Sequence, residues 1–106
     1  MRQFSPQQLH EHLQTAKSKP LLLDVREPWE FEICHIDGSQ LIPMGHVPAE
    51  ADQLDATRET VVICHHGVRS YRVAYYLEQC GFTNVINLMG GVAAWARDID
   101  PNMPTY

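Results

Sequence analysis

Apolar residues along this chain form short continuous runs that alternate with segments of helical spacing. A run of strand length that is apolar throughout is typical of a strand buried on both faces of a sheet. In the segments between the runs, apolar residues recur at spacings of three and four and so share one face of a helix. We predict strands at residues 21–25, 40–42, 61–64 and 84–88, and helices at residues 6–16, 29–33, 47–54, 68–79 and 92–97.

Glycines and prolines indicate how several of these segments end. Gly81 follows the 68–79 helix as a C′ glycine, and Phe82 is available for the apolar contact that usually accompanies it. Gly90-Gly91 gives a flexible turn before the last helix. The tail at residues 98–106 has two prolines and no periodicity, so we expect it to be irregular.

Strands that alternate with helices predict an α/β fold, with a small parallel sheet, right-handed crossovers and helices on both faces. A length of 106 residues suffices for a modest core but is too small for two domains, so we expect a single domain over residues 1–106. The hydrophobic content of 44% and the charged content of 20% are those of a globular protein.

The charge of the chain narrows the choice of partners. It carries 8 basic and 13 acidic residues, a net charge of −5, and the basic residues are scattered. Nucleic acids and anionic membranes attract clustered positive charge, so neither is expected as a partner. A small anion can still bind where local donors are concentrated.

Three cysteines, Cys34, Cys64 and Cys80, make an odd count without a Cys-x-x-Cys pair, so at least one thiol is free. The N-terminal residues lack the apolar segment of a secretory signal, and no apolar stretch approaches the length of a membrane span. We therefore expect the protein in a reducing cytoplasm, where a reactive thiol stays available.

The candidate chemistry gathers in residues 61–77. The strand ends on Cys64, a loop containing Gly67 follows, and a helix begins near Val68. The N–H groups of such a loop and of the first helical turn converge on one point, where an anion fits. The sulfur of Cys64 would lie among these donors, which favours the thiolate and predicts an activated nucleophile. Arg69 adds a fixed cation suited to an anionic substrate.

Other interpretations of this loop have to be weighed. Cys64 alone also fits an inert buried cysteine at the end of a strand, but Gly67 and Arg69 favour the nucleophile. The groups Cys34-His35 and Cys64-His65-His66 lack the residue spacing of structural zinc sites, so we expect no metal. We instead expect both loop histidines at the rim of the pocket, where their partial charge attracts anions.

The loop Cys64-His65-His66-Gly67-Val68-Arg69-Ser70 resembles the active-site loop of the rhodanese family of sulfurtransferases, which reads Cys, two variable residues, Gly, a variable residue, Arg, then Ser or Thr. Two further motifs of that family occur in order: Asp24-Val25-Arg26-Glu27-Pro28-Trp29-Glu30-Phe31 with His35-Ile36, and Gly90-Gly91-Val92-Ala93-Ala94-Trp95. The resemblance covers residues 21–95. The chain departs from the family at Cys34-His35-Ile36-Asp37-Gly38-Ser39, where Gly-His-Ile-Pro-Gly-Ala is common, and it lacks the frequent Gly-x-Pro segment of the tail.

This resemblance implies a rhodanese-like fold and sulfur transfer through a persulfide on Cys64. The thiolate would take the outer sulfur of a donor such as thiosulfate, and cyanide, a thiol or a protein acceptor would then receive it. The implied substrate-binding residues are His65, His66, Gly67, Val68, Arg69 and Ser70. Their backbone amides would hold the terminal sulfur, and Arg69 would attract the anionic donor. This route needs no cofactor and no metal.

Asp24 and Arg26 come at the end of the strand at residues 21–25, at the sheet edge where α/β proteins bind ligands. Buried acids and bases in such places are usually paired. We interpret both as residues that keep the neighbouring loop in shape, as the resemblance also implies, and not as reacting groups. Cys34 becomes an extra thiol near the site, which we interpret as partly buried and inert.

Two other functions remain open from the sequence. A cysteine phosphatase or arsenate reductase related to the rhodaneses would share the strand, loop and helix, but such loops usually hold one more residue between Cys and Arg. A persulfide carrier or interaction module acting with a protein partner would turn over small molecules only weakly.

Overall fold

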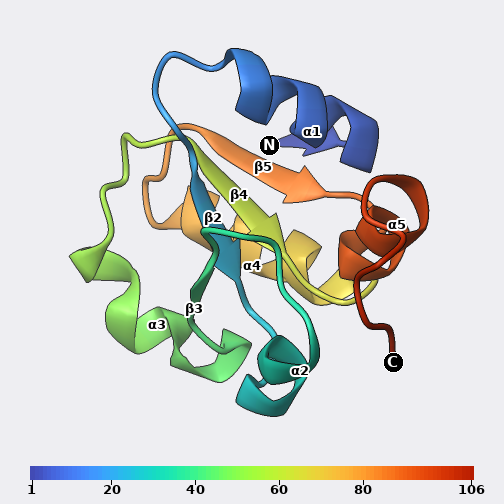
Figure 1. Cartoon of the computed structure of the whole chain (residues 1–106). Coiled ribbons are helices and arrows are strands. Elements are labelled where there is room, and N and C mark those ends of the chain that lie inside the picture. The colour runs from blue at the N-terminus through green and yellow to red at the C-terminus, as the bar shows by residue number, and fades with distance from the viewer.

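In the computed structural model, which describes all 106 residues, short strands alternate with helices along the chain (Figure 1). The strands are β1 (Arg2–Phe4), β2 (Leu21–Asp24), β3 (Gln40–Leu41), β4 (Thr60–Ile63) and β5 (Val85–Leu88). The helices are α1 (Pro6–Thr15), α2 (Pro28–Ile33), α3 (Val47–Glu50), α4 (Val68–Gln79) and α5 (Gly91–Asp98). Two 3₁₀ turns, Met44–His46 and Ala51–Gln53, flank α3.

All five strands pair in parallel in one sheet, in the order β1-β5-β4-β2-β3. β4 lies at the centre between β5 and β2, and each of its residues is buried. The carboxyl ends of parallel strands meet at one edge of a sheet, so the residues that follow β2, β4 and β5 come together there. The predicted α/β fold with a parallel sheet is confirmed.

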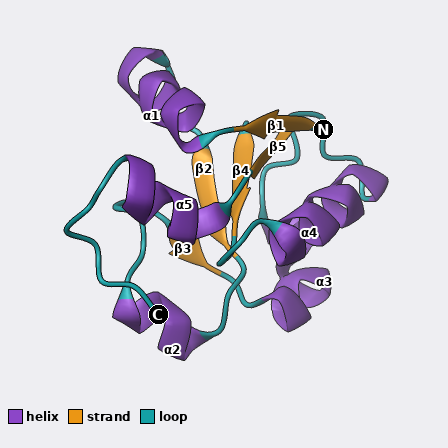
Figure 2. Cartoon of the chain, turned by 90° about the vertical axis from the view of Figure 1, so that its right-hand side faces the viewer, coloured by secondary structure: helices purple, strands orange, loops and turns teal.

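Two apolar cores, one on each face of the sheet, hold it between helices (Figure 2). Neighbouring residues of β4 enter different cores: Val62 packs with α3 and α4, whereas Val61 and Ile63 pack with α1 and α5. Leu77 of α4 and Trp95 of α5 lie in these opposite cores. Burial on both faces explains why the central strands are apolar throughout, and it confirms the prediction of helices on both sides.

Two elements differ from the predictions. β1 is not predicted by the apolar pattern, because it is only 3 residues long and two of them are exposed. The prediction of one helix at residues 47–54 is wrong, since α3 ends at Glu50 and one 3₁₀ turn, Ala51–Gln53, follows it. Pro48 lies in the first turn of α3, where its missing N–H is harmless, and it separates α3 from the 3₁₀ turn before it.

α4 follows the Cys64 loop directly and has the predicted bounds. Gly81 adopts a φ of +96°, and the N–H of buried Phe82 donates to the carbonyl of Leu77 at 3.0 Å. This is the expected glycine-terminated end of a helix. α4 is the longest helix with 12 residues, and none of the helices combines the length and apolar character needed to cross a membrane.

Candidate functional site

Cys64 is the first residue after the central strand β4, and it is 1% exposed. Its sulfur accepts a hydrogen bond from the backbone N–H of Gly67 at 3.0 Å. The loop can fold back over the sulfur because Gly67 adopts a φ of +94°. A Cβ at this position would lie 3.0 Å from the backbone nitrogen of Gly90, so the site has no room for a side chain.

α5 fixes the peptide groups at the start of the loop. The N–H of Val92 donates to the carbonyl of Cys64 at 2.9 Å, and the N–H of Ala93 donates to the carbonyl of His65 at 3.1 Å. All peptide bonds are trans, so each N–H points to the side opposite its C=O. The N–H groups of His65 and His66 therefore point away from α5.

The turn at Gly90 and Gly91 makes this contact between α5 and the loop possible. Gly91 adopts a φ of +59°, and a Cβ there would lie 2.3 Å from the carbonyl oxygen of Cys64. The expected flexible turn is instead packed tightly against the loop, because only glycine lets the two backbones approach so closely.

A chain of buried polar side chains starts at the Cys64 sulfur. The thiol donates to Ser70 Oγ at 3.3 Å, and the Ser70 hydroxyl donates to Asn87 Oδ1 at 2.6 Å. Ser70 comes from α4 and Asn87 from β5, and both are buried. The structure thus places Ser70 beside Cys64. It also adds Asn87, which the sequence does not single out because its strand pattern does not reveal what a polar residue contacts.

Arg69 forms an ion pair with Glu30 of α2. Its two terminal nitrogens donate to the two carboxylate oxygens at 2.7 and 2.9 Å. The hydrogen bonds from Arg69 lower the pKa of Glu30 to about 2 although burial acts in the opposite direction, and they raise the pKa of Arg69. The sequence predicts Arg69 as a fixed cation that attracts an anionic donor. In the structure its charge is already balanced by a carboxylate that the sequence analysis leaves unassigned.

Tyr106 connects this ion pair to a second one. Its hydroxyl donates to Glu30 Oε2 at 2.7 Å and accepts from Arg26 Nη1 at 2.9 Å. Burial raises the pKa of Tyr106 to about 12, and donation to the Glu30 carboxylate acts in the same direction. The irregular tail therefore ends at the site, a placement that nothing in its sequence pattern indicates.

Asp24 and Arg26 form a fully buried pair. Arg26 Nε donates to Asp24 Oδ1 at 2.9 Å, and Nη2 donates to Oδ2 at 2.7 Å. Burial acts against the charge of Arg26, but the hydrogen bonds to Asp24 and Tyr106 outweigh it and raise its pKa. Arg26 also donates to the backbone carbonyls of Glu30 and Cys34, at 3.3 and 2.7 Å. The pair therefore secures α2, which presents Glu30 to Arg69 of the loop.

His65 and His66 lie on the outside of the loop and stack on each other, with ring centroids 3.9 Å apart. The ring of Tyr106 stacks on His65 at 4.0 Å. Burial and the neighbouring His66 lower the pKa of His65. The neutral form of His65 is thereby favoured, which weakens the expected contribution of its charge to anion binding.

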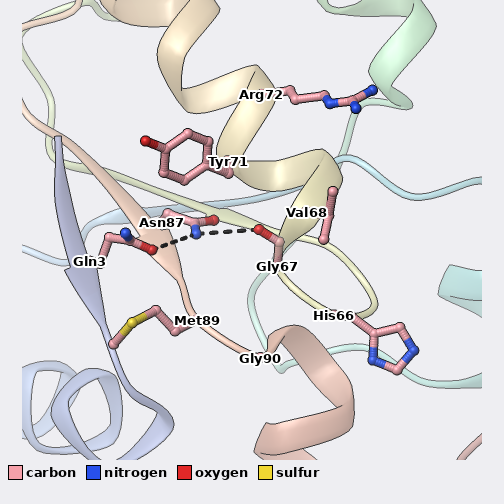
Figure 3. A pocket seen from close by; sticks show the side chains of 9 residues that line it. All are labelled: Gln3, His66, Gly67, Val68, Tyr71, Arg72, Asn87, Met89 and Gly90. Atoms are coloured by element: carbon pink, nitrogen blue, oxygen red, sulfur yellow. Dashed lines mark hydrogen bonds between the residues drawn. The ribbon is translucent and has the colours of Figure 1, made fainter.

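Two hollows flank the loop. The larger, of about 390 Å³, is bordered by Gly67, Val68 and residues of β5 and α4 (Figure 3). The smaller, of about 110 Å³, is lined by His65, Tyr106 and the buried Cys34, among others. Cys64 lines neither hollow. Val68 is 62% exposed, so its side chain lies on the surface and its expected role in binding falls to its backbone.

Cys64 is thus a buried sulfur that the loop surrounds with backbone and hydroxyl groups. A backbone N–H that points at a sulfur stabilises negative charge on it, so the contact from Gly67 suits a sulfur that becomes a thiolate or persulfide. Arg69 and Glu30 beside it form a polar wall whose net charge is close to zero.

Comparisons with known proteins agree with this geometry. The family model described as "Rhodanese-like domain" matches residues 5–98. A probable adenylyltransferase/sulfurtransferase MoeZ of Mycobacterium tuberculosis is 36% identical over 105 residues, which are 97% of this chain and 26% of that relative. A sulfurtransferase of Allochromatium vinosum is 39% identical over 77 residues, 73% of this chain and 72% of that protein.

A solved structure shows the same architecture. The crystal structure of a rhodanese-like domain protein from Staphylococcus aureus aligns with a TM-score of 0.80 at 32% identity, over 90% of this chain and 91% of that one. The present chain spans about a quarter of the length of the mycobacterial relative. The family match, the sheet and the position of the Cys64 loop together show that the chain belongs to the rhodanese-like domain family.

Proposed function

We propose that this protein is a sulfurtransferase that moves sulfane sulfur through a persulfide on Cys64. The observation that carries the proposal is the N–H of Gly67, which donates to a buried cysteine sulfur at 3.0 Å from within a loop that α5 holds in place. Sulfur transfer in general also fits the sulfurtransferase that matches most of this chain. The whole chain of 106 residues would act as one rhodanese-like domain.

The proposed reaction has two displacement steps. The Cys64 thiolate attacks the outer sulfur of thiosulfate, a sulfur–sulfur bond forms, and sulfite leaves with the electron pair of the broken bond. An acceptor, such as cyanide or a thiolate, then attacks the terminal sulfur of the persulfide. Cys64 leaves as a thiolate, so the enzyme returns to its starting state without a cofactor or metal.

The loop residues have different roles in this reaction: the backbone amides bind the transferred sulfur, and Arg69 binds the donor. The N–H groups of residues 65–70 hold the terminal sulfur, and that of Gly67 already lies against Cys64. Arg69 is the cation within the loop, but Glu30 already occupies both of its terminal nitrogens. The donor therefore binds by hydrogen bonds to the exposed edge of the ion pair rather than by unbalanced charge.

The acceptor is a small thiol, cyanide or a protein, and neither a nucleic acid nor a membrane takes part. A protein acceptor is the second candidate, because the chain aligns with about a quarter of a relative whose name joins an adenylyltransferase to a sulfurtransferase. The chain would then serve as a persulfide carrier. Its three free thiols are suited to a reducing compartment, and we propose the cytoplasm.

Mass spectrometry of the protein before and after incubation with thiosulfate tests the proposal. We expect Cys64 to gain one sulfur atom and to lose it when cyanide or a thiol is added. A Cys64→Ser variant, which retains Cys34 and Cys80, is the matched control and should gain none at those positions. A protein that remains unmodified with thiosulfate and with persulfide donors would contradict the assignment.

Loop length separates this function from that of a phosphatase. Four residues lie between Cys64 and Arg69, and the related phosphatases usually hold one more to surround a tetrahedral anion. We expect sulfur transfer from thiosulfate and negligible hydrolysis of aryl phosphates. A glycine inserted between Gly67 and Val68 should weaken sulfur transfer. Cys64-dependent phosphatase activity above the sulfur-transfer activity of the unaltered protein would overturn the assignment.

A further inference from the structure

The Ser70 hydroxyl has two candidate acceptors for one proton. Its oxygen lies 3.3 Å from Cys64 Sγ and 2.6 Å from Asn87 Oδ1, and the shorter hydrogen bond is donated to Asn87. A hydroxyl has a single O–H, so it cannot donate to both at once. Cys64 instead faces a lone pair of Ser70. This arrangement suits a protonated thiol, which donates to Ser70, and opposes an anionic sulfur.

A second contact fixes the orientation of the Asn87 amide. Its Nδ2 lies 3.4 Å from the carbonyl oxygen of Gly67 and 3.1 Å from Gln3 Oε1. Figure 3 draws both contacts as dashed lines. A backbone carbonyl can only accept, so the amide nitrogen has to face Gly67. The amide oxygen is thereby directed to Ser70 and holds its proton.

Because Ser70 and Asn87 are buried, the choice of acceptor for the Ser70 proton affects the stability of the Cys64 thiolate. Ser70 is 0% and Asn87 2% exposed, and no buried side-chain nitrogen or oxygen lacks a partner. When Cys64 becomes an anion, the Ser70 hydroxyl has to turn toward the sulfur to stabilise it. Asn87 Oδ1 then loses its donor, which is costly for an acceptor on a side chain that is only 2% exposed.

We propose that Asn87 is a positioning residue that restrains the reactivity of Cys64 by holding the Ser70 proton away from the sulfur. The role rests on the proposed function, in which the anionic sulfur of Cys64 attacks the donor. Asn87 keeps the resting thiol protonated and hydrogen-bonded to Ser70, and the rotation of the Ser70 hydroxyl accompanies formation of the nucleophile.

Two replacements of Asn87 separate this role from simple support of the fold. Asn87→Leu and Asn87→Asp both remove the amide N–H groups, so both lose the contacts to Gly67 and Gln3. They differ at the acceptor: leucine has none and releases the Ser70 proton, whereas a carboxylate accepts it more strongly and repels an anionic sulfur. A purely supporting role would affect both variants in the same direction.

The measurement is the rate at which iodoacetamide alkylates Cys64 at neutral pH, and mass spectrometry monitors the alkylated product. The sulfur displaces iodide from the reagent, so this reaction needs no sulfur donor, and it is informative even where sulfur transfer fails. Exposed Cys80 reacts in the same molecule and serves as the internal reference. Circular dichroism of each variant checks that it is folded.

We expect Asn87→Leu to react about 3- to 10-fold faster than the unaltered protein. A hydrogen bond to the thiolate raises the ionised fraction of Cys64 by about 10- to 100-fold. The stabilised thiolate is also less nucleophilic, which reduces this gain in rate to about its square root. Asn87→Asp should react at least about 10-fold more slowly. In a Ser70→Ala background the acceleration by leucine should disappear, because no proton remains to be released.

Equal slowing in both Asn87 variants, or an acceleration that persists without Ser70, would overturn the proposal. If Asn87→Leu does not fold, Asn87→Ala takes its place, because alanine also offers Ser70 no acceptor. Asn87→Ala should then speed the reaction of Cys64, and a rate equal to or below that of the unaltered protein would overturn the proposal.

Discussion

Replacing Glu30 with glutamine should reveal how much the ion pair with Arg69 contributes to stability. Glu30 is 3% exposed, and its carboxylate accepts from both terminal nitrogens of Arg69 and from the Tyr106 hydroxyl. Glutamine preserves the shape but removes the charge, and its NH₂ group would face a donor. Arg69 would lose the carboxylate that balances it.

The pKa of Glu30 gives the expected size and pH dependence. A decrease from 4.5 to about 2 on folding corresponds to about 3 kcal/mol of stability at neutral pH. The unfolded chain binds the proton more readily, so this contribution is complete above about pH 5.5 and is lost as the pH falls toward 2. By about pH 3, about 2 kcal/mol of it should be gone.

Urea unfolding of the two proteins between about pH 7 and pH 3 provides the test. We expect Glu30→Gln to be less stable by about 3 kcal/mol at neutral pH and by about 1 kcal/mol at the acid end. Asp98→Asn is the control, because Asp98 pairs with Arg97 by two similar hydrogen bonds, 2.9 and 3.1 Å, on the surface, where such pairs contribute little. A Glu30→Gln effect no larger than the control, or one that stays constant as the pH falls, would refute the reasoning.

Three further replacements test other contacts. Gly91→Ala should destabilise the protein by about 3 kcal/mol or more, because its Cβ would meet the Cys64 backbone. Gly38→Ala is the control: it has a φ of +84° but nothing within 4 Å of the added Cβ, so it should cost only about 1 kcal/mol. Equal effects in urea unfolding would contradict the close approach of α5. Asp24→Ala should cost about 3–5 kcal/mol because Arg26 is left buried without its carboxylate, and an unchanged melting temperature would disprove this. In an alkaline absorbance titration, Tyr106→Phe should lack the tyrosine that ionises near pH 12. The unaltered protein should lose stability as the pH rises above 10, the pKa of this phenol in the unfolded chain, and Tyr106→Phe should not show that loss.

The sheet and the place of Cys64 could be predicted because their signals are local. The run at residues 61–64 is apolar at consecutive positions, a pattern that burial on both faces produces, and a loop with Gly67 follows it. The resemblance of three ordered motifs then ties this loop to its neighbours at the sheet edge. Asp24 and Arg26 are paired, as charged residues at the end of a buried strand are expected to be.

The partners of the site residues could not be predicted in this way, because contacts between distant segments define them. Tyr106 lies in a tail without periodicity and meets Glu30 from 76 positions further along the chain. Asn87 is one polar residue in a buried strand, and the same pattern would arise whichever side chain it faced. Glu30 lies within a motif that resembles the family, and its place there is the one signal that could have assigned it to the site.

The hydrogen bonds from α5 to the carbonyls of Cys64 and His65 also bear on how the protein is made. A ribosome releases the chain from its N-terminus, so Cys64 emerges before the segment that orients its peptide group. β1 likewise waits for β5, its only neighbour in the sheet. A nascent chain that stops before Gly91 would therefore carry the thiol without the finished loop around it. Reactivity at Cys64 would arise only after α5 has emerged.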